Sequence, residues 1–417
     1  MNPYNLSELQ PNSDWATLPL FDRKNWTRVR FGDVVQNVVA SQSEPAAKGI
    51  ERFIGLEHLE PGSLWVRAWG DVADGTTFTR LCAPGQVLFG KRRAYQRKVA
   101  VADFDAVVSG DIYVFAPKNE RLLPDLLPFL CLSERFFEHA VGTSAGSLSP
   151  RTNWSSLAAF EFDLPPLDQQ RRIADVLWAM NGSAVIWEAA QTETDNYRKR
   201  LIDDLVLRGT GGAPLVETSI GEIPESWKTA HLADVCERVS VGIASAATHA
   251  YKKKGIPLIR NQNIKEGYLD CADLLFVTPE FDQQYAGKRL LAGDVLTVRT
   301  GYPGVSAVVP KELEHCQSFT TLVSRPIKSI LQPEFLCYWI NSAHGKKFVN
   351  VGKGGAAQQN LNAGMLGKMR LPIPPLSEQQ HICKIIHQAI EAQRYAELHT
   401  QQLVKLQIHL REIFIVK

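Results

Sequence analysis

The sequence predicts an α+β protein in which two related, mixed α/β domains are separated by two long antiparallel helices that form a coiled coil. The first observation behind this prediction is that the chain of 417 residues repeats itself close to its midpoint. The second is that each repeat ends in a long segment with apolar residues at spacings of three and four. The length itself is the third, because one hydrophobic core rarely spans so many residues.

The repeat is clearest in LPPLDQQRRI (164–173) and IPPLSEQQHI (373–382), which align without a gap. Leu167 then pairs with Leu376, an offset of 209 residues. Earlier in the chain, Trp26 pairs with Trp227 at an offset of 201. The offset grows in one direction, as loop insertions in a duplicated domain would produce, so the second half is expected to be a variant of the first.

The first part of each half contains short β-branched and aromatic runs broken by Gly, Pro and Asn, which is typical of a mixed β fold with a few helices. We expect two of these helices to begin near Pro124 and Pro333, because proline fits the first turn of a helix.

The second part of each half is predicted to be one helix of about 40 residues, hence ~60 Å long. The paired prolines cannot lie inside a helix and therefore mark its start, with Asp168 or Ser377 placed to cap it. We place the first domain at residues 1–165, the first helix at 166–208, the second domain at 209–374 and the second helix at 375–417.

The order of these parts constrains their arrangement. The second domain begins where the first helix ends, and it ends where the second helix begins. The two ends of a domain usually lie close together. We therefore expect antiparallel helices with the two domains at opposite ends, related by a pseudo-twofold axis.

Bulk composition excludes several classes of protein. The net charge of +2 is uninformative as a total, so the local distribution of charge must decide about partners. The seven cysteines are scattered singly without a CxxC pair, which predicts neither a disulfide framework nor a zinc site and favours a reducing cytoplasm. The amino-terminal residues do not resemble a signal peptide, and no run approaches the ~18 apolar residues of a membrane span.

Two related domains held apart by rigid helices suit the reading of two separated marks on one extended ligand, and DNA is the obvious candidate. Arginine, asparagine and glutamine match the edges of bases, whereas lysine mostly contacts phosphate. The candidate DNA-binding residues are Lys91, Arg92, Arg93, Arg97 and Lys98 in the first half, and Lys252, Lys253, Arg260, Asn261, Asn263, Arg299, Thr300, Tyr302, Lys353, Gln358 and Gln359 in the second.

Each candidate also has a purely structural interpretation. The lysines of the 252–254 run could lie in a solvated loop, and the arginines could form surface ion pairs. Asn261 and Asn263 could cap a turn, and the 358–360 stretch could begin a helix. His58, which aligns with Asn263, is expected to be a hydrogen-bonded structural residue.

Motifs of known catalytic sites are missing from the sequence. There is no GxSxG, no HExxH and no Walker loop. The Asn/Asp-Pro-Pro-aromatic loop that an adenine methyltransferase would need is also missing, since residues 163–167 read DLPPL. We therefore expect no catalytic residue and no metal ligand in this chain.

Five stretches resemble the specificity subunits of type I restriction-modification systems. They are RFIGLEHLE (52–60), GEIPESW (221–227), IRNQNI (259–264) and the paired PPL junctions. The resemblance implies that the globular parts are target recognition domains, each reading one half of a split DNA site. It also implies that the helices set the unread gap and dock two modification subunits, which bind S-adenosylmethionine and methylate adenine. Restriction subunits would supply the motor and the nuclease, and this chain would bind no cofactor.

Two other functions remain as alternatives. The chain could be a fused or self-sufficient methyltransferase or nuclease, which would act on DNA unaided. It could also be an adaptor with two protein-binding domains, whose complex would bind DNA weakly and without strong dependence on salt.

Overall fold

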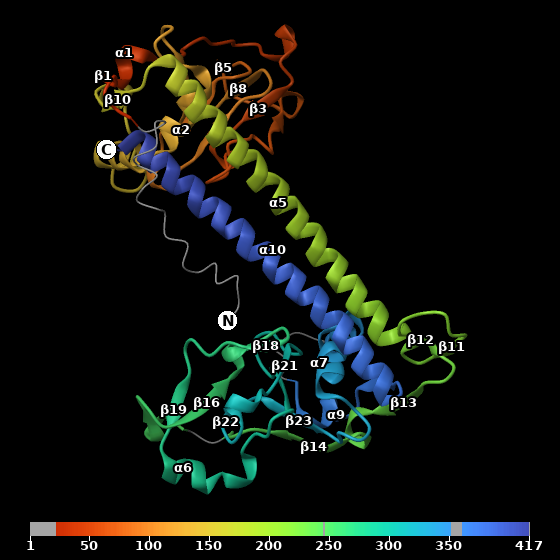
Figure 1. Cartoon of the computed structure of the whole chain (residues 1–417). Helices are drawn as coiled ribbons and strands as arrows, with labels where there is room; N and C mark the ends of the chain where they lie inside the picture. Colours follow the sequence, from red (N-terminus) through yellow and green to blue (C-terminus); the bar gives the residue numbers. More distant parts are fainter. Residues whose placement is uncertain (1–21, 245–246, 352–360, 417) are drawn as a thin grey trace. The chain divides into compact units, whose positions relative to one another are not determined.

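The computed structural model describes residues 22–244, 247–351 and 361–416 of the chain (Figure 1). These residues form two compact units. One comprises the chain up to Ala190 together with the segment from Ala396 onward, and the other comprises Gln191–Tyr395. Lys353, Gln358 and Gln359 lie outside the described residues.

The first domain contains an antiparallel sheet and a second, mixed sheet. The antiparallel sheet has the order β2 (Val35–Asn37), β9 (Ile112–Pro117), β6 (Val87–Gly90) and β7 (Val99–Val101). The mixed sheet has the order β4 (Gly70–Asp71), β3 (Arg52–Ile54), β8 (Ala106–Val108) and β5 (Arg80–Cys82). The remaining elements are the β1 (Thr27–Arg30) and β10 (Glu161–Leu164) pair and helices α1 (Phe31–Val34), α2 (Leu127–Leu132), α3 (Glu134–Gly142) and α4 (Trp154–Ala158).

The second domain has the same two kinds of sheet. Its antiparallel sheet has the order β14 (Cys236–Val241), β23 (Leu322–Pro326), β20 (Val295–Thr297) and β21 (Ser306–Val308). Its mixed sheet has the order β15 (Tyr251–Lys252), β19 (Leu275–Val277), β16 (Ile256–Arg260) and β22 (Gln317–Phe319). The other strands are the pairs β11 (Leu215–Thr218) with β12 (Gly221–Pro224), β13 (Lys228–His231) with β24 (Arg370–Ile373), and β17 (Ile264–Lys265) with β18 (Tyr268–Leu269); the helices are α6 (Pro279–Gln284), α7 (Pro333–Asn341), α8 (Ala343–Val351) and α9 (Ala363–Gly367).

The topologies of the two domains confirm the duplication inferred from the sequence. In the antiparallel sheet, β2, β9, β6 and β7 correspond in order to β14, β23, β20 and β21. In the mixed sheet, β3 pairs in parallel with β8 as β16 does with β22. The two helices expected at prolines are also present: Pro124 opens a 3₁₀ turn that leads into α2, and Pro333 is the first residue of α7.

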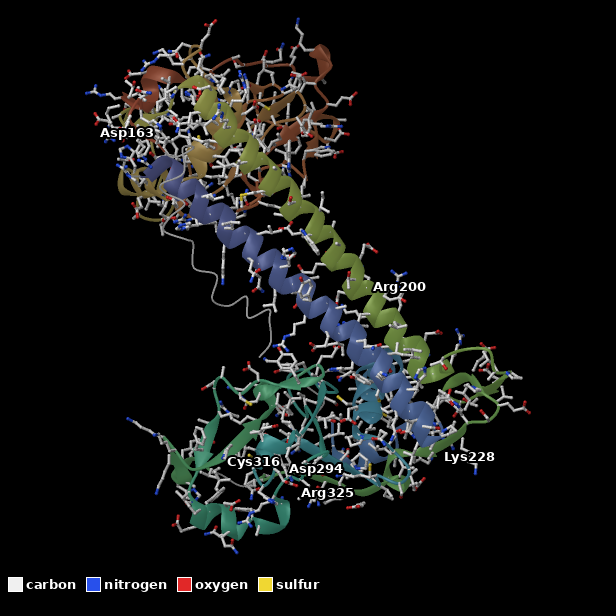
Figure 2. All side chains as sticks on the ribbon, in the orientation of Figure 1. Asp163, Arg200, Lys228, Asp294, Cys316 and Arg325 are labelled. Carbon is white, nitrogen blue, oxygen red and sulfur yellow. The ribbon has the colours of Figure 1, made fainter. Side chains whose placement is uncertain are left out.

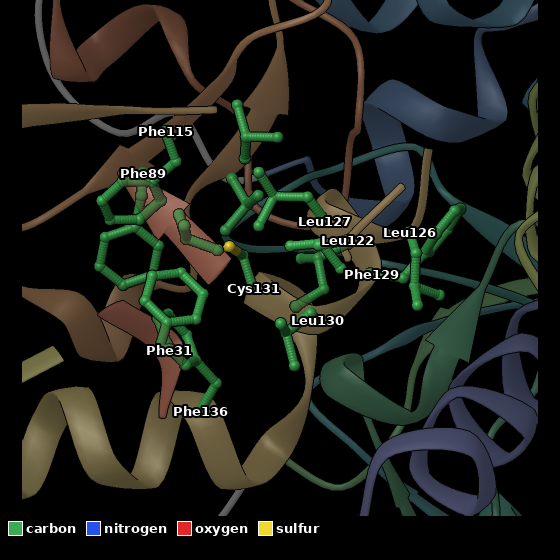
Figure 3. Close-up of a cluster of buried hydrophobic side chains, with 14 of the residues drawn as sticks. Phe31, Phe89, Phe115, Leu122, Leu126, Leu127, Phe129, Leu130, Cys131 and Phe136 are labelled. Atoms are coloured by element: carbon green, nitrogen blue, oxygen red, sulfur yellow. The ribbon is translucent and has the colours of Figure 1, made fainter. Parts of the chain in front are cut away.

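The larger of two hydrophobic clusters described in the first domain lies between its antiparallel sheet and its helices. Figure 3 shows phenylalanine rings on one side of Cys131, and leucines together with Phe129 from the α2 region on the other. The ring of Phe31 is fully buried and packs edge-on against Phe115 at a centroid distance of 5.4 Å. Ile173 and Leu177, from the long helix that follows the domain, belong to the same core and fasten the helix to it.

The second domain contains an ion pair whose carboxylate is fully buried and whose arginine side chain is 20% exposed. Arg325 on β23 pairs with Asp294, just before β20, with Nε to Oδ1 at 2.7 Å and Nη2 to Oδ2 at 2.8 Å. The two residues are labelled close together in Figure 2. Asp294 also accepts a hydrogen bond from the Leu291 amide at 2.9 Å. In the first domain, Gln86 accepts the corresponding bond from the Ala83 amide at 2.9 Å. The backbone bond is therefore shared, while the charged pair belongs to the second domain.

Both predicted long helices are present, as α5 (Leu167–Arg208) and α10 (Leu376–Val416). They begin one residue before Asp168 and Ser377, so these two side chains lie within the first turn and do not cap it. Among the helices of the described residues, none has an apolar stretch that could cross a membrane.

Within each unit, a segment of α5 runs antiparallel to a segment of α10. In the first unit, Trp187 contacts His399 at a centroid distance of 4.9 Å, and Leu410 packs on the same core as Trp178. The first unit also contains a cap made by α10, in which Glu412 accepts a hydrogen bond from the Glu134 amide at 3.0 Å.

In the second unit, the side-chain Nε2 of Gln393 donates to Oδ1 of Asp195 at 3.3 Å. Ile202, further along α5, lines one cavity with Ile390, which precedes Gln393 on α10. The two helices therefore run in opposite directions in this unit as well.

A buried glutamine explains why the junction motif occurs twice. Gln170, in the first turn of α5, is fully buried. Its Oε1 accepts from the amide of Leu123 at 2.9 Å, and its Nε2 donates to the carbonyls of Arg121 at 2.7 Å and Pro165 at 2.8 Å. These bonds tie the start of the helix to the loop that precedes α2.

Gln379 makes the same three bonds in the second unit. Its Oε1 accepts from the amide of Gln332 at 2.8 Å, and its Nε2 donates to Ile330 at 2.9 Å and Pro374 at 2.8 Å. It is also fully buried. All three partners stand 209 residues after those of Gln170, so the two sets of bonds are equivalent atom for atom. We call each set, formed by Gln170 or Gln379 with its three backbone partners, a glutamine clamp.

We predict that Gln170→Leu and Gln379→Leu will each lower the free energy of unfolding by about 3 kcal/mol, because each leaves a part-buried amide, a part-buried carbonyl and a buried carbonyl without the side chain that satisfies them. Chemical denaturation followed by tryptophan fluorescence measures this. Gln284→Ala, at an exposed position of α6, is the control and should cost less than about 0.5 kcal/mol. If the clamp variants were as stable as this control, the clamp would not be an anchor.

Candidate nucleic-acid interface

In each domain, a turn from the mixed sheet meets a loop from the antiparallel sheet. The 3₁₀ turns Leu56–His58 and Asn261–Asn263 follow β3 and β16. In the first domain, Lys98 Nζ donates to the Leu56 carbonyl at 2.7 Å. In the second, the Tyr302 hydroxyl donates to the Asn261 carbonyl at 3.4 Å. The carbonyls of Leu56 and Asn261 are thus bonded from equivalent loops, which follow β6 and β20. We call the surface where this turn and this loop meet the two-loop face of each domain.

His58 and Asn263 hold these turns in shape. Nδ1 of His58 accepts from the Gly55 amide at 3.0 Å, and Oδ1 of Asn263 accepts from the Arg260 amide at 2.9 Å. Asn263 is 3% exposed, and its Nδ2 donates to the carbonyls of Asp270 and Asp273. Asn263 therefore caps a turn, which is the structural interpretation that the sequence also allowed. We do not retain it as a candidate for reading bases.

Three arginines of the first domain converge on one carboxylate and one hydroxyl. Asp111 pairs with Arg92 at 3.2 Å and with Arg151 at 2.8 Å. Ser149 Oγ accepts from Arg92 at 3.1 Å and from Arg93 at 3.3 Å. We call Arg92, Arg93 and Arg151, with Asp111 and Ser149, the arginine cluster.

The electrostatics of the arginine cluster reflect a surplus of positive charge. Burial alone would raise the pKa of the Asp111 carboxyl, but hydrogen bonds from Arg151 and Arg92 outweigh burial and hold it below its ordinary value. The pKa of the neighbouring Lys91 is lowered, first by burial and then by the positive charge of Arg80. An anionic ligand would relieve this repulsion.

Arg97 and Lys98, both DNA-binding candidates, form contacts with other residues of the same domain. Arg97 forms an ion pair with Glu134 of α3 and lies over the ring of Phe137 at 5.3 Å. Lys98 donates to the Leu56 carbonyl, as described above. Both side chains therefore fix the loop after β6 to the rest of the domain.

The structure brings together five of the candidates of the second domain. Asn261 Nδ2 donates to Thr300 Oγ1 at 3.1 Å, and its Oδ1 accepts from the Arg299 amide at 3.1 Å. Tyr302 is 47% exposed and bonds the same turn, while Arg260 pairs with Asp273 at 3.1 Å.

Two arginines of this group have unused donor capacity. The Nε atoms of Arg260 and Arg299 are buried and have no hydrogen-bond partner among the described residues. The amide of Leu361, the first described residue after position 360, donates to the Arg299 carbonyl at 3.1 Å. The backbone of Arg299 is thus held from both sides.

Lys252 and Lys253 lie apart from this group. Lys252 is on β15, which is two strands away from β16 in the mixed sheet, hence ~10 Å from it. Both lysines are exposed, which fits either phosphate contact or a solvated loop.

Sequence reasoning missed four residues of the first domain's face: Arg80, Asp111, Ser149 and Arg151. Arg151 faces Arg92 through an isolated antiparallel bridge, which joins segments far apart in the chain. The only local signal was a lone basic residue in SPRTN (149–153).

Comparison with known proteins gives one family. Residues 24–184 and 224–406 match the family model described as the type I restriction modification DNA specificity domain. The specificity subunit of the type I restriction enzyme MjaX from Methanocaldococcus jannaschii is 30% identical over 177 residues, which are 41% of this chain and 41% of that relative. The specificity subunit of the enzyme MjaVIII from the same organism is 22% identical over 402 residues, 89% and 88% of the two chains.

Solved structures agree on the fold. The S subunit of a type I restriction-modification system from M. genitalium superposes with a TM-score of 0.55 at 10% identity, over 94% of this chain and 96% of that one. A chain from a structure that addresses complex assembly and conformational transition of the type I R-M system gives a TM-score of 0.62 at 18% identity, over 93% and 97%.

The lowered pKa of Asp111 leads to a prediction about acid stability. Because the folded pKa lies below the unfolded one, the stability that this carboxylate contributes is present above the unfolded pKa and lost as pH falls through the folded pKa. We expect the free energy of unfolding to fall less in Asp111→Asn than in the parent chain between about pH 5 and about pH 2. Denaturation at several pH values measures this, and equal losses in both proteins would contradict it.

Proposed function

Since this chain belongs to the type I restriction-modification DNA specificity family, we propose that it binds double-stranded DNA and reads a bipartite site, with one half read by each domain. The observation that carries the proposal is the two-loop face, which recurs at equivalent backbone positions in both domains and carries basic side chains in each.

The side chains of each face suit contact with base edges. A guanidinium group presents a planar fork of donors that matches guanine O6 and N7. The first domain offers the arginine cluster, and the second offers Arg299 beside the half-exposed ring of Tyr302. Lysines such as Lys91 and Lys253 suit phosphates, which position the protein without reading sequence.

We further propose that α5 and α10 dock two modification subunits. Large apolar side chains on these helices are exposed, among them Ile186 at 70%, Tyr197 at 63% and Ile408 at 45%. Such side chains are expected where a partner covers them. The modification subunits would bind S-adenosylmethionine and methylate adenine, and restriction subunits would join the complex, so this chain would itself be non-catalytic.

Methylation mapping in a host that expresses this chain with its modification subunit tests the proposal. We expect methylated adenines in a bipartite motif with a gap of fixed length. We also expect affinity of the complex for DNA to fall steeply as salt rises, because phosphate contacts release counterions. A single contiguous motif would contradict the proposal of two reading domains.

Two other outcomes would establish the alternatives. If the purified chain methylated or cleaved DNA without partners, it would be an enzyme. If the assembled complex bound DNA weakly and without dependence on salt, the chain would be a protein adaptor.

Substitutions on the two faces should act on different halves of the site. Arg299→Ala should weaken discrimination at one half by about tenfold, and Arg92→Ala should do so at the other, because each removes a base contact on one domain only. Lys91→Ala should instead weaken binding to all duplexes about equally, because a phosphate contact carries no sequence information. Binding to duplexes scrambled in one half at a time measures this. Lys228→Ala, at an exposed position of β13, is the matched control. Equal effects at both halves would show that the faces are misplaced.

A further inference from the structure

We propose that Asp111 is a positioning residue: with Ser149 it fixes the guanidinium groups of Arg92, Arg93 and Arg151, and this fixed array makes the first domain prefer guanine in its half of the site. The inference rests on the proposed function, because it assumes that this face meets DNA. It adds a role for an acidic side chain on a surface whose ligand would be an anion.

The backbone of Asp111 is held before its side chain makes any contact. The residue lies between β8 and β9, where its amide donates to Ser109 Oγ at 3.2 Å. Its carbonyl accepts from the amide of Lys91 at 3.0 Å, which joins it to the loop after β6. The side chain is 20% exposed, so its two oxygens start from a defined position.

The two oxygens of Asp111 orient two arginines. Oδ1 accepts from Nε of Arg151 at 2.8 Å, and Oδ2 accepts from Nη2 of Arg151 at 3.4 Å. Oδ2 also accepts from Nη1 of Arg92 at 3.2 Å. A paired contact of this kind fixes both the position and the plane of a guanidinium.

Ser149 completes the array. Its Oγ accepts from Nη2 of Arg92 at 3.1 Å and from Nη2 of Arg93 at 3.3 Å. Arg92 is therefore held at both Nη atoms, by Asp111 on one side and Ser149 on the other. The segments that carry these residues are also joined, because the Arg93 amide donates to the Pro150 carbonyl at 2.7 Å.

Fixed orientation matters for reading bases more than for holding phosphates. A flexible arginine loses rotamer freedom when a base contact orders it, and this loss weakens the contact. A phosphate accepts hydrogen bonds from many directions, so orientation contributes little there. Guanine O6 and N7 accept two parallel bonds, so a guanidinium already held in the right plane favours guanine.

A carboxylate on this surface has a cost that makes the proposal testable. Asp111 repels phosphate and so lowers affinity for DNA of any sequence. Removing its charge should therefore strengthen non-specific binding while it weakens discrimination. A residue that contributed only stability or only charge would not change the two in opposite directions.

The second domain has no carboxylate at this position. Tyr113 on β9 and Leu322 on β23 face equivalent residues of β6 and β20, so Thr320 takes the place of Asp111. Its carbonyl accepts from Asn261 Nδ2 at 3.5 Å. The effect of Asp111 should therefore be confined to one half of the site.

The experiment uses the complex of this chain with its modification subunit and the site found by methylation mapping. Affinities are measured for the intact site and for duplexes in which each half is scrambled in turn. For Asp111→Asn we expect discrimination at one half of the site to fall by about tenfold and discrimination at the other half to be unchanged. We also expect the variant complex to bind the scrambled duplex more tightly than the parent complex does. Replacing guanine in that half by 7-deazaguanine, which lacks N7, should weaken binding of the parent complex by about tenfold.

Asp103→Asn is the matched control, because Asp103 is an exposed carboxylate of the same domain. It should leave discrimination unchanged. If Asp111→Asn discriminated within about twofold of this control, or if 7-deazaguanine had no effect, the inference would be overturned.

Ser149→Ala keeps the test decisive if Asp111→Asn does not fold. It removes the hydroxyl shared by two arginines without changing charge, and it should lower discrimination at the same half by about threefold. Unchanged discrimination would overturn the inference. If the parent complex itself did not discriminate between intact and scrambled sites, the proposed function would fail instead.

Discussion

The structure depends on one buried amide in each half of the chain. Gln170 and Gln379 each satisfy one backbone amide and two carbonyls at the point where a globular domain passes into a long helix. These backbone groups are buried or partly buried, so an apolar side chain at either position would leave them without a protein partner. The clamp therefore sets where the helix begins and how it leaves the domain, and the helix in turn contributes Ile173 and Leu177 to the domain's core.

Around this constant junction the two domains have diverged, both inside the domain and at the proposed face. The backbone bond accepted by Gln86 in the first domain is accepted by Asp294 in the second, where Arg325 adds a charge pair. At the two-loop face, Leu56 corresponds to Asn261, and Asp111 corresponds to Thr320. The architecture is thus retained while the chemistry of each face is its own, which is what two different half-sites would require.

The sequence was sufficient for features that depend on local pattern. Proline pairs and apolar spacing placed the long helices within a residue of α5 and α10, and the repeat gave the duplication. The detailed surface depended on pairings between distant segments. Arg151 lies beside Arg92 only because a β-bridge joins two loops that are far apart in the chain. Arg97 forms an ion pair with Glu134 on a helix of the same domain, and the side chain of Asn263 bonds within its own turn. No local pattern distinguishes these arginines and asparagines from exposed ones.

The first unit is assembled from two segments that lie on either side of the second unit in the chain. The segment from Ala396 onward is synthesised after the whole of the second unit, yet it supplies Leu410 to the first core and Glu412 to the start of α3. During translation, about 200 further residues are made between the end of the amino-terminal part at Ala190 and the segment from Ala396 that completes the first unit. This takes roughly 10–40 s at ordinary rates of synthesis. Until then the uncovered surface of the amino-terminal domain is open to chaperones or to the equivalent helix of another nascent chain, so the order of synthesis itself favours late, cooperative maturation.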